Sequence, residues 1–464
     1  MRPLTRPLTR PLTRPLTRPL NRPLNRPLDM ARARCRRHAT AIICIVGALI
    51  AGARTVRLIP ALTAPLRAGS EPVGVDFATI VYGPNVLVAE GLNPWDIHNS
   101  VPRFGIFPSS PLWPSGYVFG WLFTLIGFDL VLTIWLVITV VVIVMGARRI
   151  ALSFDVDPRL AWLIGLATVS SAVALYDVEL GQTGAGLVAI VAFFAALHPP
   201  GPGLQLPGPG RSRLAEAFGF GAVALFLFPK PTFALAAFAA ELAYRRRVDW
   251  CMRAVAVLAV VGGTCLAVIM ARSNDGPGEI LAAIRTTARI LGEAPVQRTA
   301  GDRVDFLSLI VPSPALDLLM VVVSLAIVVA ISRWKSPTTF ERLFIGTIVT
   351  TMLTYHHMYD TMHLLVLALV STVIWPGHRR WIVLTALVVS AWVLKLHPLE
   401  RALSSITGIE PFALHARLVF VVGAAMLVDA LVRIRRRSRN GQLPLGEPDV
   451  SDGRDAISSG SGRS

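Results

Sequence analysis

The chain has 464 residues, of which 53% are hydrophobic and only 16% are charged. Soluble domains carry roughly 25% charged residues. This composition, with a mean hydropathy of +0.59, therefore excludes an ordinary soluble domain and indicates an integral membrane protein. The net charge of +17 does not indicate a nucleic-acid partner, because the arginines occur in short runs between apolar segments. The four cysteines lack metal-ligand spacing, which predicts free thiols without disulfides or a zinc site.

The amino-terminal segment repeats Arg-Pro-Leu-Thr and then Arg-Pro-Leu-Asn in four-residue steps. Proline at every fourth position is incompatible with a helix, so residues 1–29 are predicted to be disordered, or untranslated if Met30 is the start. Residues 39–60 follow a cluster of arginines and resemble a signal sequence. They lack a clear small-residue cleavage site, which predicts an uncleaved first transmembrane helix.

A long polar stretch follows and is predicted to be the first extracytoplasmic loop, residues 54–111. Its informative part, here called the lip, spans residues 74–114 and reads GVDFATIVYGPNVLVAEGLNPWDIHNSVPRFGIFPSSPLWP. The lip gathers acidic, aromatic and polar side chains with almost no positive charge: Asp76, Tyr82, Asn85, Glu90, Trp95, Asp96 and His98. Long loops with convergent polar side chains are more often functional than mere connectors. We therefore predict that the lip belongs to the reaction site of a membrane enzyme.

Many apolar segments follow, and they predict an all-α polytopic membrane protein with about 10 to 12 transmembrane helices. These segments lie at about 112–128, 129–147, 159–175, 183–197, 214–228, 231–244, 251–271, 306–331, 341–356, 358–375, 381–396 and 412–432. The transmembrane domain is expected over residues 30–435, with a second large extracytoplasmic loop at 272–305. Residues 436–464 are expected to form a disordered cytoplasmic tail.

The arginine runs predict the orientation, because cytoplasmic loops of membrane proteins are enriched in Lys and Arg. If these runs face the cytoplasm, the lip, Lys230, the 272–305 loop and the polar cluster after residue 355 lie outside. One point stays open. An external lip and a cytoplasmic Arg148-Arg149 pair require an odd number of crossings, whereas residues 112–147 look like two. Either residues 112–128 cross only partly or the arginine pair lies outside.

Two charged residues stand out at the predicted membrane surface. Asp76, at a boundary between helix and loop, could act as a general base on a hydroxyl acceptor, or could merely cap a helix. Lys230, between Pro229 and Pro231, is a lone cation between apolar segments. It could bind the phosphate of a lipid carrier, or its ammonium could extend to the membrane interface without a specific partner.

Two polar breaks interrupt later apolar segments. His356, Asp360 and His363 share a helical face, and with the adjacent His357 could bind a phosphate, a metal or one another across two helices. Gln182 follows Asp177 and Glu179 in the other break, which is suited to orienting a sugar through hydroxyl hydrogen bonds. Arginines in the 272–305 loop could pair with an anionic head group.

Several of these segments, in this order, resemble motifs of one family. The start of the lip resembles the opening of GT-C glycosyltransferases in VDFATIVYGPNVLVAEGLNPWDIHN, and FPSSPLWP stands where the family has Tyr-Pro-Pro-Leu. ELGQTGAGLVAI resembles the Gly-Gln-x-Asn helix start of the family, with Gly184 at the asparagine position. FPKPTFAL resembles its Lys-Pro turn, and YHHMYD resembles the polar start of one of its late helices. From about residue 40 to 435, the chain is similar to glycosyltransferase family 87, the actinobacterial mannosyl- and arabinofuranosyltransferases.

The resemblance implies a GT-C fold and a multi-pass protein of the plasma membrane with an extracytoplasmic active site. It implies inverting, metal-independent transfer of a mannosyl or arabinofuranosyl unit from a polyprenyl-phosphate sugar to a cell-envelope glycan or glycolipid. Asp76 would be the catalytic base, Lys230 a phosphate ligand, and His356 or His357 a contact to the donor phosphate. Substrate contacts are expected from Tyr82, Trp95, Asp96, Gln182 and Asp360. The expected partners are the bilayer, the donor and the acceptor; no metal or other cofactor is implied, because the sugar donor is a substrate.

Two other classes of function are compatible with a membrane protein of this composition. A transporter or flippase of lipid-linked glycan precursors would show internal repeats and helices broken at the membrane midplane. No repeat between the two halves is evident, and the polar breaks fall at segment ends, which favours the enzyme. An inactive scaffold of envelope assembly would be distinguished only by an assay of an Asp76→Asn variant.

Overall fold

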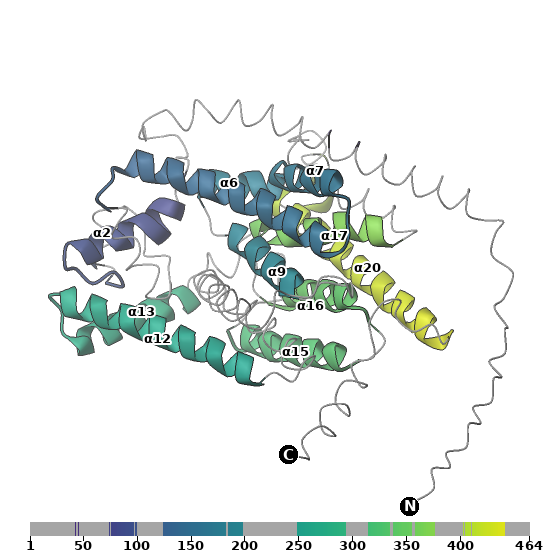
Figure 1. The fold of residues 1–464 in the computed structure, drawn as a ribbon. Helices are drawn as coiled ribbons and strands as arrows, with labels where there is room; N and C mark the ends of the chain where they lie inside the picture. Colours follow the sequence, from purple (N-terminus) through teal and green to yellow (C-terminus); the bar gives the residue numbers. More distant parts are fainter. Residues whose placement is uncertain are drawn as a thin grey trace, which may run out of the picture.

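The structure is a computed structural model. It describes residues 74–99, 124–197, 248–293, 314–375 and 404–440, and the isolated positions 42, 45 and 402. Within these ranges positions 75, 97, 182, 183, 335, 336, 355–357 and 410 are not described. All regular secondary structure in the described ranges is helical, which confirms the helical fold class (Figure 1). The predicted first helix, the 198–213 linker and the spans at 214–244 and 381–396 lie outside the described residues.

The elements follow the apolar segments closely. In chain order they are η1 (Phe77–Tyr82), α2 (Gly83–Ala89), α6 (Phe128–Ser153), α7 (Pro158–Val169), α8 (Ala172–Leu180), α9 (Ala185–Leu197), α12 (Val248–Arg272), α13 (Pro277–Glu293), α15 (Pro314–Arg333), α16 (Thr339–Leu353), η3 (Met358–Thr361), α17 (Met362–Ile374) and α20 (Pro411–Arg439). Helix α20 extends four residues beyond the boundary expected at residue 435. The 272–305 segment is not a plain loop, because 17 of its residues form α13.

One described helix, α6, is long and apolar enough to cross a membrane. Helices α7 and α8 would be a second span if counted together, but they are bent by 58° where a single span at 159–175 was expected. The bend has a local cause. The Ser170 hydroxyl bonds back to the Leu166 carbonyl, and Ser171 caps the next helix by accepting from the Ala174 N–H. A side chain that competes for backbone groups ends one helix and begins another.

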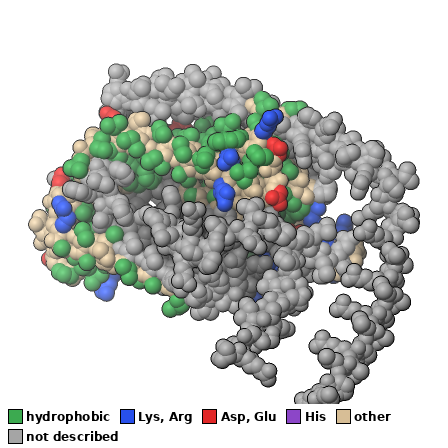
Figure 2. Space-filling view, in the orientation of Figure 1, with side chains coloured by type: hydrophobic (Ala, Val, Ile, Leu, Met, Phe, Trp, Pro, Cys, Tyr) green, Lys and Arg blue, Asp and Glu red, His purple; other side chains and the backbone are tan. Residues whose placement is uncertain are grey.

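The core of the bundle surrounds α17. Every side chain from Met362 to Thr372 is buried, and α17 contacts α6, α7, α9 and α16. A helix that is apolar on all sides belongs inside such a bundle. By contrast, α6 leaves large apolar side chains exposed, including Leu130, Val137 and Val141. Figure 2 shows hydrophobic side chains over this face of α6, with basic residues toward its carboxyl end.

One end of the bundle, here called the arginine end, joins the ends of α6, α16, α17 and α20. The Phe340 ring lies 4.7 Å from Phe154 and 5.0 Å from Trp375 between centroids. The Arg433 guanidinium lies 5.3 Å from the centre of the Trp375 ring. These contacts bring together the carboxyl ends of α6, α17 and α20 and the amino end of α16.

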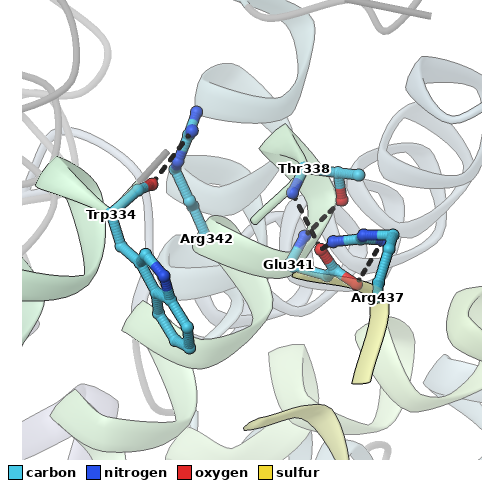
Figure 3. Close-up of polar contacts among 5 residues, drawn as sticks. All are labelled: Trp334, Thr338, Glu341, Arg342 and Arg437. Atoms are coloured by element: carbon cyan, nitrogen blue, oxygen red, sulfur yellow. Dashed lines mark hydrogen bonds and ion pairs between the residues drawn. The ribbon is translucent and has the colours of Figure 1, made fainter. Parts of the chain in front are cut away.

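The arginine end is closed by a buried ion pair between α16 and α20 (Figure 3). Glu341 is fully buried, and its Oε1 accepts a hydrogen bond from Arg437 Nη1 at 3.2 Å and its Oε2 one from Arg437 Nη2 at 2.5 Å. Glu341 also accepts from the Thr338 N–H, while the Thr338 hydroxyl accepts from the Glu341 N–H. This reciprocal capping box begins α16, and the same carboxylate fixes α20 against it.

The opposite end of α6 carries the lip and is here called the lip end. Phe128 and Trp135, near the start of α6, contact Phe77 of η1, with ring centroids 6.1 and 5.3 Å away. A single helix therefore runs from the lip to the Arg148-Arg149 pair. Helix α6 covers the expected segment at 129–147, and residues 112–123, which hold most of the other expected segment, lie outside the described residues.

Candidate functional site

Asp76 lies at the start of the lip helices. It occupies the N-cap position of η1, is half-buried, and its side chain makes no capping hydrogen bond. The helix-capping alternative for Asp76 is therefore not supported. The next residue, Phe77, is fully buried and packs with Tyr82, Phe128 and Trp135. This aromatic cluster fixes the backbone that carries the Asp76 carboxylate.

The lip joins the bundle at the turn between α8 and α9. The Gly74 N–H donates to the Glu179 carbonyl at 2.7 Å, and Trp135 Nε1 donates to the Gly181 carbonyl at 3.1 Å. Gly181 ends α8 in the left-handed conformation at φ 71°, and a Cβ there would lie 2.6 Å from the Phe77 Cβ. Only glycine combines this conformation with so close an approach. Asp76 and residues 177–181 of the polar break, about 100 residues apart, are therefore neighbours.

Asp177 begins α9. It is fully buried, and its carboxylate accepts hydrogen bonds from the Gly184 N–H at 2.9 Å and the Ala185 N–H at 3.3 Å. A carboxylate at a helix amino terminus satisfies free N–H groups and interacts favourably with the helix dipole. A Cβ at Gly184 would lie 2.4 Å from Asp177 Oδ1, so glycine is required for this cap. The polar break that was predicted to orient a sugar thus has a structural carboxylate at its centre.

The contact of the lip with the α8–α9 turn, here called the junction, also adjoins the late polar cluster around Asp360 and His363. Helix α8 contacts η3, and a Cβ at Gly184 would lie 3.1 Å from the Met362 Cε. Asp360, in η3, is 1% exposed. His363 is fully buried, and its Nε2 lies 3.0 Å from the Thr351 hydroxyl of α16. Since that hydroxyl donates to the Thr347 carbonyl, Nε2 is the donor in the bond to Thr351.

The far side of the lip packs on α12 and α13. Ile280, Ala283, Ile284 and Thr287 follow one helical face of α13 toward Val88 and Trp95. The Thr287 hydroxyl donates to the Trp95 carbonyl at 2.7 Å, and the Asn274 N–H donates to the Gly91 carbonyl at 2.9 Å. The two segments predicted to be extracytoplasmic loops therefore lie against each other, as the left side of Figure 1 shows for α2 and α13.

Three of the five predicted substrate residues lie in the lip. Trp95 is 3% exposed and packs the lip against Ile269 of α12 and Ile280 of α13, and its contact with a sugar stays a prediction. The carboxylate of Asp96 is half-buried and accepts from the His98 N–H and the Asn99 side chain, which stabilises a turn. Tyr82 is half-buried, with its ring 5.0 Å from Phe128, and it lies beside Asp76 in the same cluster.

The other predicted residues do not all lie in the described ranges. Asp76, Tyr82 and Asp360 lie at the lip end, where the structure brings the lip, the α8–α9 turn and η3 together. Gln182, Lys230, His356 and His357 lie outside the described residues. Comparison of the chain with protein-family models, curated proteins and solved structures finds no match in any of the three.

Sequence reasoning missed the capping role of Asp177 and the need for glycine at 181 and 184. A signal was present in Leu-Gly-Gln, because a glycine directly after an apolar helical run commonly ends a helix in the left-handed conformation. The pairing of Glu341 with Arg437 was also missed. The Thr338-x-x-Glu341 spacing before an apolar run predicts a capping box, although it does not predict the arginine partner.

Proposed function

We propose that this chain is a polytopic membrane glycosyltransferase of the GT-C type. It would transfer a mannosyl or arabinofuranosyl unit from a polyprenyl-phosphate sugar to a cell-envelope glycan or glycolipid. The observation that supports this most is the position of Asp76. Half-buried Asp76 lies two residues from Gly74, whose N–H donates to the Glu179 carbonyl of α8, and α8 in turn contacts η3. Three of the segments that carry the family resemblance, namely the start of the lip, the α8–α9 turn and η3, thus meet at one end of the bundle.

The proposed orientation follows from the two ends. The arginine end carries Arg433, Arg435, Arg436, Arg437 and Arg439 on α20, together with Arg148 and Arg149 on α6. Basic residues of this kind favour the cytoplasmic side. The lip end would then face the outside, where polyprenyl-phosphate sugars and envelope acceptors would be available to it.

The proposed reaction is a direct displacement at the anomeric carbon. Asp76 accepts the proton of the acceptor hydroxyl as the acceptor oxygen forms a bond to the anomeric carbon. The bond from that carbon to the phosphate oxygen breaks, and its electron pair leaves with the lipid phosphate. Attack and departure on opposite faces invert the configuration. Stabilisation of the leaving phosphate is assigned to Lys230, His356 and His357, as cations or hydrogen-bond donors.

In the proposed site, residues of the junction that take no part in the reaction would fix the positions of the reacting groups. Asp177 fixes the start of α9, and Gly181 allows η1 to approach the end of α8. Such supporting contacts keep a catalytic carboxylate within the narrow range of positions that a displacement requires. No role in proton transfer is assigned to Asp177, because its carboxylate is fully buried and accepts two backbone hydrogen bonds.

The test is sugar transfer in membranes that contain the full chain. Radiolabelled polyprenyl-phospho-mannose and polyprenyl-phospho-arabinose are supplied separately, and wild type is compared with Asp76→Asn. Removal of a general base typically lowers the rate by about 100- to 10,000-fold. Asp155→Asn is the matched control, because Asp155 is an exposed carboxylate at the opposite end of α6 and has no assigned role in the reaction, and we expect it to keep transfer within about threefold of wild type.

The possible outcomes separate the hypotheses. Transfer from one donor that is lost in Asp76→Asn would support both the enzyme class and the base. Transfer that survives in this variant would contradict the role of Asp76 while keeping the class. Absence of transfer from either donor, with a broad set of acceptors, would favour a transporter or flippase of lipid-linked precursors, or a scaffold.

A further inference from the structure

The outer face of α20 changes from apolar to basic near its carboxyl end. Val421, Val428 and Val432 are 59%, 59% and 41% exposed. Arg435, Arg436 and Arg439 are also exposed. At about 100° per residue, the three valines with Arg435 and Arg439 fall within ~40° of one line along the helix. These residues therefore form one stripe along α20, which is apolar at the valines and positively charged at Arg435 and Arg439.

The remaining arginines of this segment lie on another face and already have partners inside the protein. Arg433 lies over the Trp375 ring and pairs with Asp429 at 3.6 Å, and Arg437 pairs with the buried Glu341. Both lie roughly 120° to 160° around the helix from the valine line. The inner arginines thus fix α20 to the bundle, whereas the outer ones face away from it. In Figure 1 the last turns of α20, in yellow, project beyond the neighbouring helices.

We propose that the outer face of α20 binds an anionic phospholipid, with its acyl chains along the valines and its phosphate at Arg435 and Arg439. Guanidinium groups bind phosphate through paired hydrogen bonds, and clusters of basic residues next to an apolar helix attract anionic lipids. The carboxyl end of a helix dipole carries a partial charge of about −0.5, which opposes an anion. Three exposed arginines outweigh that charge. The orientation rule requires arginines on the cytoplasmic side but does not require them to continue an exposed apolar stripe.

This site does not depend on sugar transfer and requires only that the chain lies in a bilayer. The experiment uses the full chain, purified in detergent and titrated with phosphatidylglycerol or phosphatidylcholine. Native mass spectrometry then gives the apparent Kd of the first bound lipid. We expect tighter binding of phosphatidylglycerol, and roughly 10- to 30-fold weaker binding of it in the double variant Arg435→Gln/Arg439→Gln. Arg435→Lys/Arg439→Lys keeps the charge and should remain within about fivefold of wild type.

The matched control is Arg149→Gln/Arg333→Gln, which removes two exposed arginines from other helices. It should bind phosphatidylglycerol within about twofold of wild type, since only the α20 face is assigned to the lipid. Equal loss in the control would overturn the proposal in favour of diffuse surface charge. Unchanged binding in the α20 variant would overturn it directly. Displacement of the lipid by equimolar glycerol phosphate would show that the arginines bind free phosphate rather than a lipid.

Discussion

The two ends of the bundle are built by different means. At the arginine end, Glu341 and Arg437 form a buried ion pair, and the rings of Phe154, Phe340 and Trp375 pack on one another. At the lip end, the Asp177 carboxylate holds backbone N–H groups, and two glycines allow helices to approach closely. The arginine end uses its buried acid to fix two helices together. The lip end uses its buried acid to shape a turn, and it keeps a second acid, Asp76, partly accessible.

The difference indicates where stability and function are concentrated. A buried carboxylate whose lone pairs are engaged by an arginine and by backbone has no capacity left for a substrate. A half-buried carboxylate beside a shaped turn can still accept a proton. Under the proposed function, the arginine end serves structure and orientation, and the lip end serves the chemistry.

The largest effect on stability is expected from Glu341→Gln. This change leaves Arg437 beside a neutral amide and weakens the cap on the Thr338 N–H, at a site with no exposure. Breaking a buried ion pair costs about 3 kcal/mol or more. Asp429→Asn is the control, since its pair with Arg433 is longer and partly exposed and is worth at most ~1 kcal/mol. Unfolding titrations in mixed detergent micelles would measure both. Equal losses would contradict the account of the arginine end.

A somewhat smaller loss is expected from Gly184→Ala. The added Cβ would lie 2.4 Å from Asp177 Oδ1, and the cap on α9 would have to move. Overpacking of this kind costs about 1–3 kcal/mol. Gly263→Ala in α12 is the matched control, because nothing lies within 4 Å of its added Cβ. It should be neutral or stabilise the helix by up to ~1 kcal/mol. The same titrations compare the two variants, and a harmless Gly184→Ala would show that the junction is looser than described.

The smallest effect concerns the packing of the lip on α13. Thr287→Val removes the hydrogen bond to the buried Trp95 carbonyl while keeping the shape of the side chain. A loss of about 1 kcal/mol is expected. Thr286→Val, one position along, is the control and should change the free energy of unfolding by less than ~0.5 kcal/mol. Faster hydrogen exchange at residues 90–96 in Thr287→Val alone would localise the effect to the lip. Identical behaviour of the two variants would contradict the coupling of α13 to the lip.

The long apolar elements could be predicted from the sequence, and the junction between them could not. Helices α6 and α20 lie within a few residues of their expected starts, because apolar runs of this length define a helix without tertiary information. The bend at Ser171 was missed because a serine cap competes with continued helix only in its local context. The contact between Gly74 and Glu179 joins segments about 100 residues apart, which no local pattern encodes.

The site residues show the same limit. Asp76 was singled out by its position beside apolar segments, and the structure keeps it half-buried at the lip end. Trp95 was expected to contact substrate because it lies in the motif that resembles the family, and in the structure its ring packs the lip on α12 and α13. Residue type alone does not distinguish a ring that lines a site from one that supports it.

The central claim is that the lip end and the arginine end lie on opposite sides of a membrane. Glu90→Cys at the lip end and Asn440→Cys after α20 place exposed thiols at the two ends, in a chain whose four native cysteines are replaced by alanine. A membrane-impermeant maleimide is then applied to intact and to permeabilised cells. The account predicts that Glu90→Cys reacts in intact cells and that Asn440→Cys reacts only after permeabilisation. Reaction of both thiols, or of Asn440→Cys alone, in intact cells would contradict it.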